Sequence, residues 1–355
     1  MIVVIADDLT GAAELAGIAC SYGLQTEMLM EVASPLLSCD VLVVATDTRS
    51  MTETEASDYI RCLAAQLKGV PVQIFKKTDS ALRGHVMAEL SSLLSVTDYR
   101  HVLFVPANPS RNRLIRQGVY YVDGIPISES DFSFDPEFPA YTSFMTERFP
   151  EAAEWNVAIP DVGSMEDIRV ALKDLTADTL LAGAADLFET WLQSMGYTRQ
   201  SILKSEVVGL DDILLVCGST QSRTPSLITV TSMPVEVYEG IASVSLWIEQ
   251  ATALYKKKHA LALTIPPRHL TGREVAVRLR IAMSVIVKTL VALHRPSQLV
   301  IEGGSTASCC LKAVGWHSFK VLGELSPGVV RMMAPCGTVV ILKPGSYDWN
   351  GLFGF

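Results

Sequence analysis

The sequence predicts an α/β protein with two domains, each a mostly parallel sheet flanked by helices. Apolar runs typical of buried strands alternate with helical patterns through both halves of the chain. The 355 residues are enough for about two domains, and 49% of them are apolar, so each domain can form a sizeable core. Loops rich in Asp, Thr, Ser and Gly follow many of the predicted strands.

The first half of the chain carries a regular strand–helix alternation. Strands are expected at Ile2–Ala6, Thr26–Met30, Val41–Ala45, Val72–Phe75, Val102–Val105 and Val157–Ile159. Helices are expected at Ala12–Tyr22, Glu53–Leu67, Val86–Leu94 and Met165–Leu175. The stretch from Pro106 to Pro150 has little periodicity, and its aromatic residues favour a functional loop over disorder.

The alternation restarts in the second half, after a polar stretch from Gly196 to Asp212. We therefore expect one domain at residues 1–205 and another at residues 206–355. Strands are predicted at Ile213–Cys217, Val235–Tyr238, Leu261–Ile265, Leu299–Glu302 and Val339–Leu342. One helix is predicted from Thr224, and others at Ala242–Lys258, Gly272–Leu293 and Ser305–Val314.

Composition and charge exclude several classes of protein. The net charge of −9 argues against a nucleic-acid or anionic-membrane surface. No run reaches the roughly 18 apolar residues of a membrane helix. The apolar N-terminus lacks a basic region, so we interpret it as a strand of a cytoplasmic protein. The seven cysteines include no CxxC pair and fit reduced thiols, and no metal is assigned to Cys or His.

Basic residues are concentrated in one part of this acidic chain. None precedes Arg49, and ten fall between Arg49 and Arg116. Such a cluster favours a small anionic ligand, although a solvated surface explains any single member.

The segment from Ile2 to Ala12 is the most informative stretch. A β-branched run stops on Asp7 and Asp8, where an open α/β sheet binds its ligands. The alternative is that Asp8 or Thr10 only caps the next helix. Since one cap needs one such residue, the adjacent aspartates indicate a further role.

Four loops of the first half follow predicted strands and should meet at one edge of the sheet. Together they supply carboxylates, hydroxyls, guanidinium groups and an ammonium, which suits a small polyhydroxy acid. Arginine binds a carboxylate bidentately, and aspartate accepts from hydroxyls or removes a proton. The loops are Asp7–Gly11, Thr46–Arg49, Lys76–Gly84 and Pro106–Arg113.

Glycine-bearing loops follow three strands of the second half, at Cys217–Thr220, Gly303–Thr306 and Lys343–Ser346. Glycine lets the backbone approach a phosphate, and a helix start binds anions. A plain turn capped by Ser305 remains the alternative, and Gly328 is explicable as a turn residue. The chain contains no GxxxxGK[ST], GxGxxG, HRD or DFG signature.

In this order, the loops resemble the four-carbon acid sugar kinase family, long described as a domain of unknown function. The resemblance extends over the whole chain and is most specific at Ala6–Ala12 and Lys76–Gly84. It implies an N-terminal domain that binds the acid sugar, a C-terminal domain that binds ATP, and an active site in the cleft between them. Further matching segments are Asp47–Ser50, Pro106–Pro109, Gly118–Val122, Cys217–Ser219, Gly303–Thr306, Pro327–Gly328 and Lys343–Gly345.

The resemblance also implies roles for individual residues, with Mg²⁺ and ATP as cofactors and no metal ligand assigned. The substrate contacts would be Asp7, Asp8, Arg49, Lys77, Thr78, Asp79, Ser80 and Arg83. The catalytic residues among them would be Asp8, Lys77 and Asp79. The ATP contacts would be Ser219, Gly303, Gly304, Ser305, Thr306, Gly328 and Gly345.

The expected reaction is transfer of the ATP γ-phosphoryl group to the terminal hydroxyl of threonate, erythronate or 3-oxotetronate. Arg49 or another arginine of the cluster would clamp the carboxylate, and Lys77 would stabilise the transferring group. Asp8 or Asp79 would orient the hydroxyl. Ser305 and Pro344 depart from the family pattern, so a non-catalytic sugar-acid sensor is a second hypothesis. A sugar-acid dehydrogenase is disfavoured because GxGxxG is absent, and a homodimer is left open.

Overall fold

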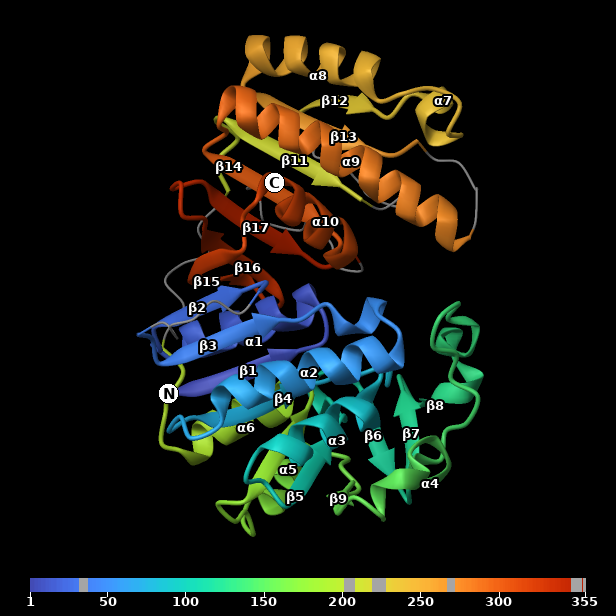
Figure 1. The fold of residues 1–355 in the computed structure, drawn as a ribbon, viewed down its shortest axis with the longest axis vertical. Coiled ribbons are helices and arrows are strands. Elements are labelled where there is room, and N and C mark those ends of the chain that lie inside the picture. Colours follow the sequence, from blue (N-terminus) through green and yellow to red (C-terminus); the bar gives the residue numbers. More distant parts are fainter. Residues whose placement is uncertain (32–37, 201–207, 219–227, 267–271, 346–352, 354–355) are drawn as a thin grey trace. The chain divides into compact units, whose positions relative to one another are not determined.

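The computed structural model describes residues 1–31, 38–200, 208–218, 228–266, 272–345 and 353 (Figure 1). The chain forms two compact units, one of residues 1–26 and 30–200 and the other of residues 27–29 and 201–355. Each unit contains a largely parallel sheet with helices packed on it, which confirms the predicted fold class. The predicted boundary after residue 205 lies outside the described residues.

The sheet of the first unit is parallel throughout its described strands. Their order is β3-β1-β4-β10-β5-β9. Ala6 lies opposite both Ala45 and Lys77, and Gly183 lies opposite both Lys77 and Val105, so the loops after these five strands leave the sheet at one edge. The strands are β1 Ile2–Ala6, β3 Val41–Ala45, β4 Gln73–Lys77, β5 His101–Val105, β9 Val157–Ala158 and β10 Thr179–Gly183.

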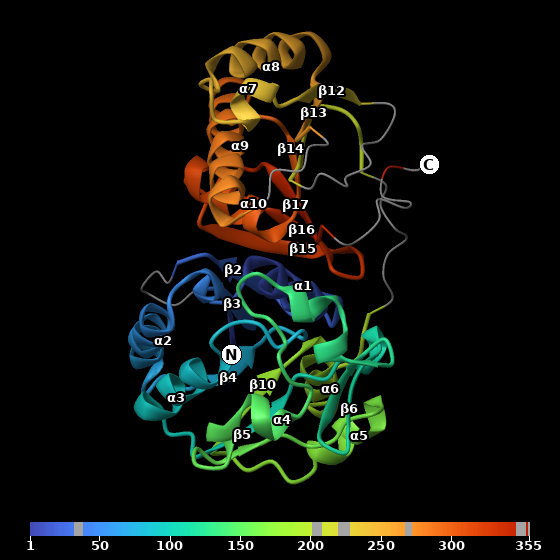
Figure 2. The ribbon, with the colours of Figure 1, turned by 90° about the vertical axis from the view of Figure 1, so that its right-hand side faces the viewer.

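Helices cover both faces of this sheet. Figure 2 shows α2 and α3 on one face, and α1, α5 and α6 on the other. The Thr52 side chain caps α2 and the Glu55 side chain bonds back to the Thr52 backbone, so this helix starts where the sequence predicts. The helices are α1 Leu9–Ser21, α2 Glu53–Leu67, α3 Val86–Val96, α4 Met145–Arg148, α5 Met165–Ala171 and α6 Ala185–Ser194.

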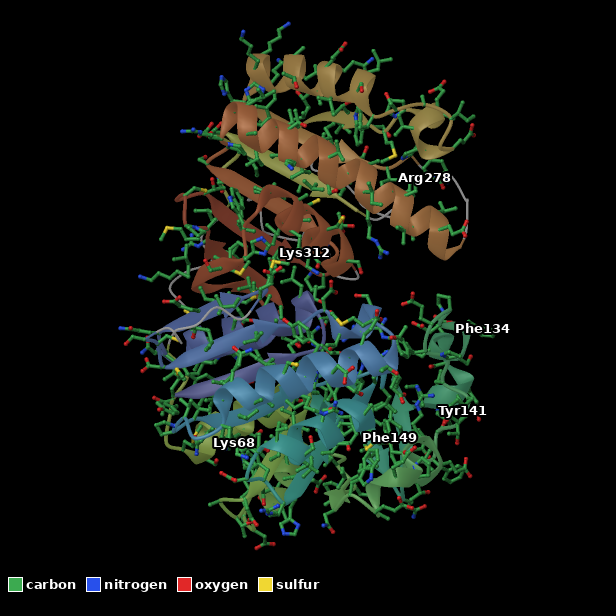
Figure 3. The ribbon with its side chains drawn as sticks, viewed as in Figure 1. Lys68, Phe134, Tyr141, Phe149, Arg278 and Lys312 are labelled. Carbon is green, nitrogen blue, oxygen red and sulfur yellow. The ribbon has the colours of Figure 1, made fainter. Side chains whose placement is uncertain are left out.

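The segment predicted to be irregular contains a small antiparallel sheet of β6 (Arg113–Arg116), β7 (Val119–Val122) and β8 (Ile125–Pro126). Its strands are too short for a periodic pattern to emerge from the sequence. Phe149 is buried against Phe104, with ring centroids 5.5 Å apart. Phe134 and Tyr141 are 85% and 70% exposed and lie on the surface of this segment (Figure 3).

The second unit contains the sheet β12-β13-β11-β14-β17-β16-β15-β2, in which the first five strands are parallel and the last three antiparallel. The sequence did not predict β12, β15 or β16. The half-exposed residues of β15 do not alternate cleanly, so period two is weak there. The strands are β2 Thr26–Leu29, β11 Ile213–Cys217, β12 Thr229–Ser232, β13 Ala260–Thr264, β14 Gln298–Glu302, β15 Ser318–Ser326, β16 Val329–Met333 and β17 Val339–Lys343.

The helices of the second unit include α9 and α10, which pack against each other. Ile213, Leu215 and Cys217 of β11 join a core cluster that also contains Val208 and Phe353. The helices are α7 Val235–Tyr238, α8 Ser245–Lys258, α9 Arg273–His294 and α10 Gly304–Val314.

The prediction of a strand at Val235–Tyr238 is wrong. These residues form α7, because Pro234 immediately before them starts a helical turn and β12 has already supplied the edge strand. Four residues, three of them apolar, are too few to distinguish a strand from a helix by periodicity alone. The helix predicted from Thr224 begins outside the described residues.

Candidate active site

The centre of the site on the first unit is the guanidinium group of Arg49. Its Nε donates to Oδ2 of Asp7 at 2.8 Å, and its Nη2 donates to Oδ1 of Asp8 at 3.1 Å. The same Nη2 lies 3.7 Å from Oδ1 of Asp79. The loops after β1, β3 and β4 therefore meet on one cation. Carboxylates raise the pKa of Arg49 well above its ordinary value despite its burial.

Asp8 has two structural roles. It is the N-cap of α1, where its side chain accepts from the backbone N–H of Gly11, so Asp8 does cap the helix, but capping is not its only contact. It also accepts from the Thr10 hydroxyl and from Arg49. Burial alone would raise the pKa of Asp8, but Arg49, Lys77 and Thr10 outweigh it and hold that pKa below its ordinary value. Asp8 is therefore ionised at neutral pH.

Both carboxylate oxygens of Asp79 accept hydrogen bonds from residues of its own loop. Oδ2 accepts from Nε of Arg83 at 2.7 Å and from the backbone N–H groups of Ala81 and Arg83, and Oδ1 accepts from Nη2 of Arg83 at 3.2 Å. Burial opposes ionisation of Asp79, but Arg49 and Arg83 hold its pKa far below the ordinary value. This bidentate pair fixes the position of both residues.

Two buried polar atoms at the ends of neighbouring strands have no hydrogen-bond partner among the described residues. They are Oδ1 of Asp7 and Oγ1 of Thr78. Buried polar groups are nearly always bonded, and exceptions require an explanation such as a missing ligand or water. Close by, the buried Lys77 donates from Nζ to the Thr78 carbonyl at 2.9 Å and lies 3.7 Å from Oε2 of Glu14. An ammonium has three donors, so Lys77 keeps capacity for a further acceptor.

A buried network supports this site and was not predicted. Nζ of Lys76 lies 2.8 Å from Oε2 of Glu89, both side chains being 1% exposed. Oε1 of Glu89 accepts from Thr48, which bonds in turn to Thr46. Burial raises the pKa of Glu89 against the opposing effect of Lys76. The available signal was a glutamate on the apolar face of the helix that begins at Val86.

The loop after β4 is also tied to the small antiparallel sheet. Arg113 donates to the hydroxyl of Ser80, and Tyr120 donates to the Ser80 carbonyl at 2.6 Å. The guanidinium groups of Arg83 and Arg113 lie 5.9 and 5.5 Å from the ring centre of Phe132. The aromatic segment thus holds two arginines beside the site.

The predicted substrate residues therefore gather at the same edge of the first sheet. Arg49 contacts Asp7, Asp8 and Asp79. Asp79 also pairs with Arg83, and Ser80 accepts from Arg113. Lys77 and Thr78 lie together at the end of β4. That these side chains bind a substrate stays a prediction.

The predicted glycine loops of the second unit also share one edge. Cys217 pairs with Glu302, and Glu302 pairs with Lys343, so Gly218, Gly303 and Gly345 follow the ends of adjacent parallel strands. Val330 lies opposite Leu342, which places Gly328 at the start of β16, at this same edge. Ser219 lies outside the described residues.

The start of α10 suits an anion. Its N-cap is Gly303, at φ 92°, and no side chain caps the helix. Ser305 is exposed within the first turn, so the alternative of a turn capped by Ser305 is wrong. The first N–H groups of a helix have no partner inside it and attract anions such as phosphates. Gly304 and Thr306 belong to this same turn.

Tight packing fixes this turn in place. A Cβ on Gly218 would lie 2.2 Å from Oγ1 of Thr306 and 2.9 Å from the Glu302 carbonyl oxygen, so only glycine fits. At the ends of β14 and β17, Nζ of Lys343 donates to Oε1 of Glu302 at 2.8 Å and to the Pro344 carbonyl at 3.1 Å. Burial raises the pKa of Glu302, against the opposing effect of Lys343.

The described residues do not form a protein cage for a metal ion. No group of three or more His, Cys, Asp or Glu side chains among them is placed to hold one. Mg²⁺ in phosphoryl-transfer enzymes is bound largely through substrate phosphates and water, so it does not need such a cage. None of the helices in the described part of the chain has both the length and the apolar composition of a membrane-spanning helix.

The fold and the two sites define a two-domain α/β protein, with a charged polar site on one domain and a glycine-lined helix start on the other. Comparisons with known families agree. A family model described as a sugar-binding N-terminal domain matches residues 2–188, more than half of the chain. One described as a nucleotide-binding C-terminal domain matches residues 238–347. The chain belongs to the family that combines these two domains, and the predicted family resemblance is confirmed.

The curated relatives are kinases of four-carbon acids. The chain is 24% identical to a D-threonate kinase of Salmonella typhimurium, over 95% of this chain and 91% of the relative. It is 25% identical to a D-threonate kinase of Bordetella bronchiseptica, covering 95% and 89%. It is 24% identical to a 3-oxo-tetronate kinase of Brucella melitensis, covering 99% and 93%.

Solved structures share the fold. A Haemophilus influenzae protein superimposes with a TM-score of 0.73 at 19% identity, over 99% of this chain and 98% of that protein. A Salmonella typhimurium protein gives a TM-score of 0.78 at 17% identity, covering 99% and 97%.

The lowered pKa values of the carboxylates around Arg49 predict how the free energy of unfolding changes at acid pH. A carboxyl whose pKa is lowered by folding stabilises the protein above its unfolded-state pKa, and loses that contribution as the pH falls toward the folded value. Asp8 and Asp79 both have lowered pKa values. We expect the free energy of unfolding of Asp79→Asn to fall less steeply than that of the wild type between about pH 5 and pH 2.

Urea midpoints measured across this pH range test the expectation. The control is Asp58→Asn, which removes an exposed carboxylate that pairs with Arg61 in α2 and should leave the wild-type slope unchanged. The carboxyl groups with raised pKa values are present in the wild type and in both variants. Their opposite effect on the pH dependence of stability therefore cancels in the comparison. Parallel curves for wild type and Asp79→Asn would contradict the expectation.

Proposed function

We propose that this protein is an ATP-dependent kinase that phosphorylates the terminal hydroxyl of a four-carbon acid sugar such as threonate, erythronate or 3-oxotetronate. The kinase class accords with the names of the relatives, which cover nearly the whole chain. The observation that carries the proposal is Asp8, a carboxylate held ionised at the start of α1 beside Arg49 and Lys77.

Asp8 is the group best placed to orient the acceptor hydroxyl. Its side chain is 20% exposed, compared with 4% for Asp7 and 11% for Asp79. Asp79 is already engaged by Arg83 and two backbone N–H groups, so its role is to hold the cations. Asp8 accepts the hydroxyl proton as the oxygen attacks phosphorus. Since this transfer depends mainly on positioning and charge stabilisation, a weak base is sufficient.

Lys77 and the start of α10 would stabilise the transferring group. The ammonium of Lys77 has capacity for a phosphoryl oxygen beside Asp8, and the uncapped N–H groups after Gly303 suit nucleotide phosphates. Mg²⁺, bound through those phosphates, would supply further charge neutralisation. The placement of the reaction between the two domains remains a prediction.

The substrate carboxylate needs an arginine that the protein has not already saturated. Nε and Nη2 of Arg49 are directed at Asp7 and Asp8, so Arg49 is better described as positioning those carboxylates. Arg113, held over Phe132, donates from Nη1 to Ser80 and is the better candidate for the clamp. The partnerless atoms of Asp7 and Thr78 would then bond substrate hydroxyls.

The direct test is ADP release with Mg-ATP and a panel of acids: D- and L-threonate, D- and L-erythronate, and the 3-oxo forms. Strong turnover with one acid would support the kinase and identify its substrate. ATP binding without turnover on any acid would overturn the four-carbon assignment. Acid binding with no ATP binding or turnover would favour the non-catalytic sensor, because Ser305 and Pro344 would then have removed the nucleotide site.

The proposed roles predict a separation of turnover from nucleotide binding. Asp8→Asn and Lys77→Met should each lower kcat by about 10²–10⁴-fold, the usual range for a group acting on the proton or the developing charge. The dissociation constant for ATP, measured by calorimetry, should change little. Asp47→Asn is the matched control, because Asp47 lies in the loop after β3 and its carboxylate accepts from the Ser50 hydroxyl of the same loop. Near-normal turnover in both variants would exclude these roles.

The proposed role of Arg113 as the carboxylate clamp predicts a change in KM for the acid. Arg113→Gln should raise KM for the acid by about tenfold or more, as expected when a charge-assisted bond to the substrate is lost. Its KM for ATP should stay close to the wild-type value. The same substitution at Arg116, the exposed end of β6, is the control. A normal KM for the acid in Arg113→Gln would show that another arginine binds the carboxylate.

A further inference from the structure

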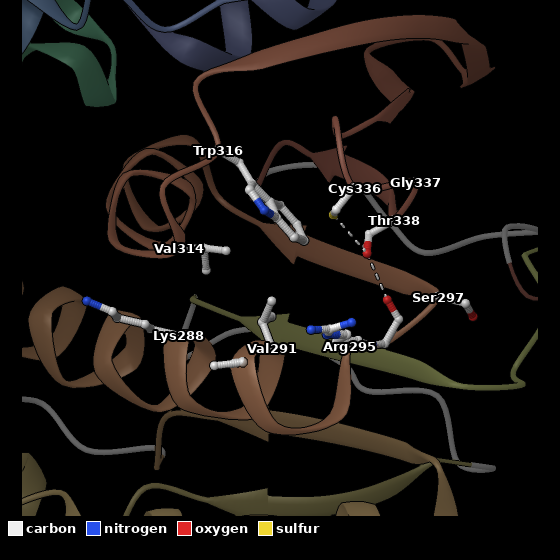
Figure 4. Close-up of a pocket in the computed structure, with 11 residues that line it drawn as sticks. Lys288, Val291, Arg295, Ser297, Val314, Trp316, Cys336, Gly337 and Thr338 are labelled. Atoms are coloured by element: carbon white, nitrogen blue, oxygen red, sulfur yellow. Dashed lines mark hydrogen bonds between the residues drawn. The ribbon is translucent and has the colours of Figure 1, made fainter.

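The second unit contains a cavity of about 670 Å³ that the proposed kinase reaction does not use (Figure 4). It lies beside the C-terminal ends of α9 and α10 and the turn before β17. Gln298 and Val339 begin β14 and β17 here, whereas Gly303 and Gly345 follow the other ends of the same strands. Five residues at about 3.3 Å each separate the two edges. The cavity is therefore distinct from the glycine loops.

Its walls combine apolar surface with positive charge. Val291, Val314 and the Trp316 indole supply apolar surface, and Lys288 and Arg295 supply two cations. Among the described residues, no carboxylate lines the cavity and neither cation forms an ion pair. Figure 4 shows the Arg295 guanidinium beside Val291 and across the cavity from Trp316. A volume of this size is within the range of small-molecule sites.

The helix dipole explains the position of only one of these two cations. Arg295 is the C-cap of α9, where a cation complements the helix dipole. Lys288 lies well before the last turn of α9, so the dipole does not explain its position. The Thr338 hydroxyl, which also lines the cavity, already has partners: it donates to the Pro296 carbonyl at 3.1 Å and accepts from the Cys336 thiol. The two cations are the charged groups left to bind a ligand.

We propose that this cavity is a second ligand site, which binds a small organic anion with an apolar body and a single carboxylate or phosphate head. The apolar body packs between Trp316 and Val291, and the head pairs with Arg295 and Lys288.

The test uses 1-naphthoate as the probe and calorimetry on the full chain, with ADP saturating so that the nucleotide site is occupied. We expect one binding site. Arg295→Gln and Lys288→Gln should each weaken it about tenfold, the effect of losing one charge-assisted bond. Acetate, which lacks the apolar body, and 1-naphthamide, which lacks the charge, should both bind at least about tenfold more weakly.

Lys257→Gln is the matched control, because it removes one exposed cation of α8 that does not line the cavity. 1-Naphthyl phosphate in the same titration shows which head group is preferred, and tight binding of either probe supports the proposal. Loss of binding when ADP is added, equal affinity in wild type and Arg295→Gln, or no binding at millimolar probe would each overturn it. Binding is read directly, so the result does not depend on kinase activity.

Discussion

The compensation of charge around Arg49 is the constraint on which the first domain depends. Three carboxylates at the ends of adjacent strands would repel one another and resist burial without a shared cation. Removing one partner of a buried ion pair generally costs about 3–5 kcal/mol, because the other charge is left unpaired. The position of Arg49 therefore fixes the loops after β1, β3 and β4 together, and with them the start of α1.

The two proposed ligand sites at the strand ends rely on different chemistry. The first relies on side-chain charges, which must be matched to one another before any ligand arrives. The second relies on backbone N–H groups, which require close approach rather than charge, and so Gly218 and Gly303 are needed where a Cβ or an ordinary φ would obstruct the turn. A carboxylate and hydroxyl-bearing substrate suits the first arrangement, and a polyphosphate suits the second.

The sequence predicted that the loops of each proposed site share one edge of a sheet, because parallel strands impose it. Once Ile2–Ala6 and the strand before Lys77 are recognised, their following loops must share an edge, and the register of Ala6 with Lys77 confirms this. What the sequence could not predict depends on contacts between distant residues. The insertion of β10 between β4 and β5 is decided by packing, with no local pattern to signal it. A glutamate on the apolar face of α3 signals a buried partner, but it does not identify Lys76 as that partner.

The lowered pKa of Asp8 clarifies which kind of catalysis the site can support. A carboxylate stabilised by two cations is a weak base, so it cannot activate a hydroxyl by removing its proton in advance. It can orient that hydroxyl from the first moment of binding, because it is ionised throughout the neutral range. In a loose phosphoryl-transfer transition state the nucleophile needs little activation and the phosphoryl oxygens need positive charge nearby. Lys77, one of the two cations that weaken Asp8 as a base, would then stabilise the transfer, so the electrostatics of the cluster suit the proposed kinase better than an enzyme that depends on proton abstraction.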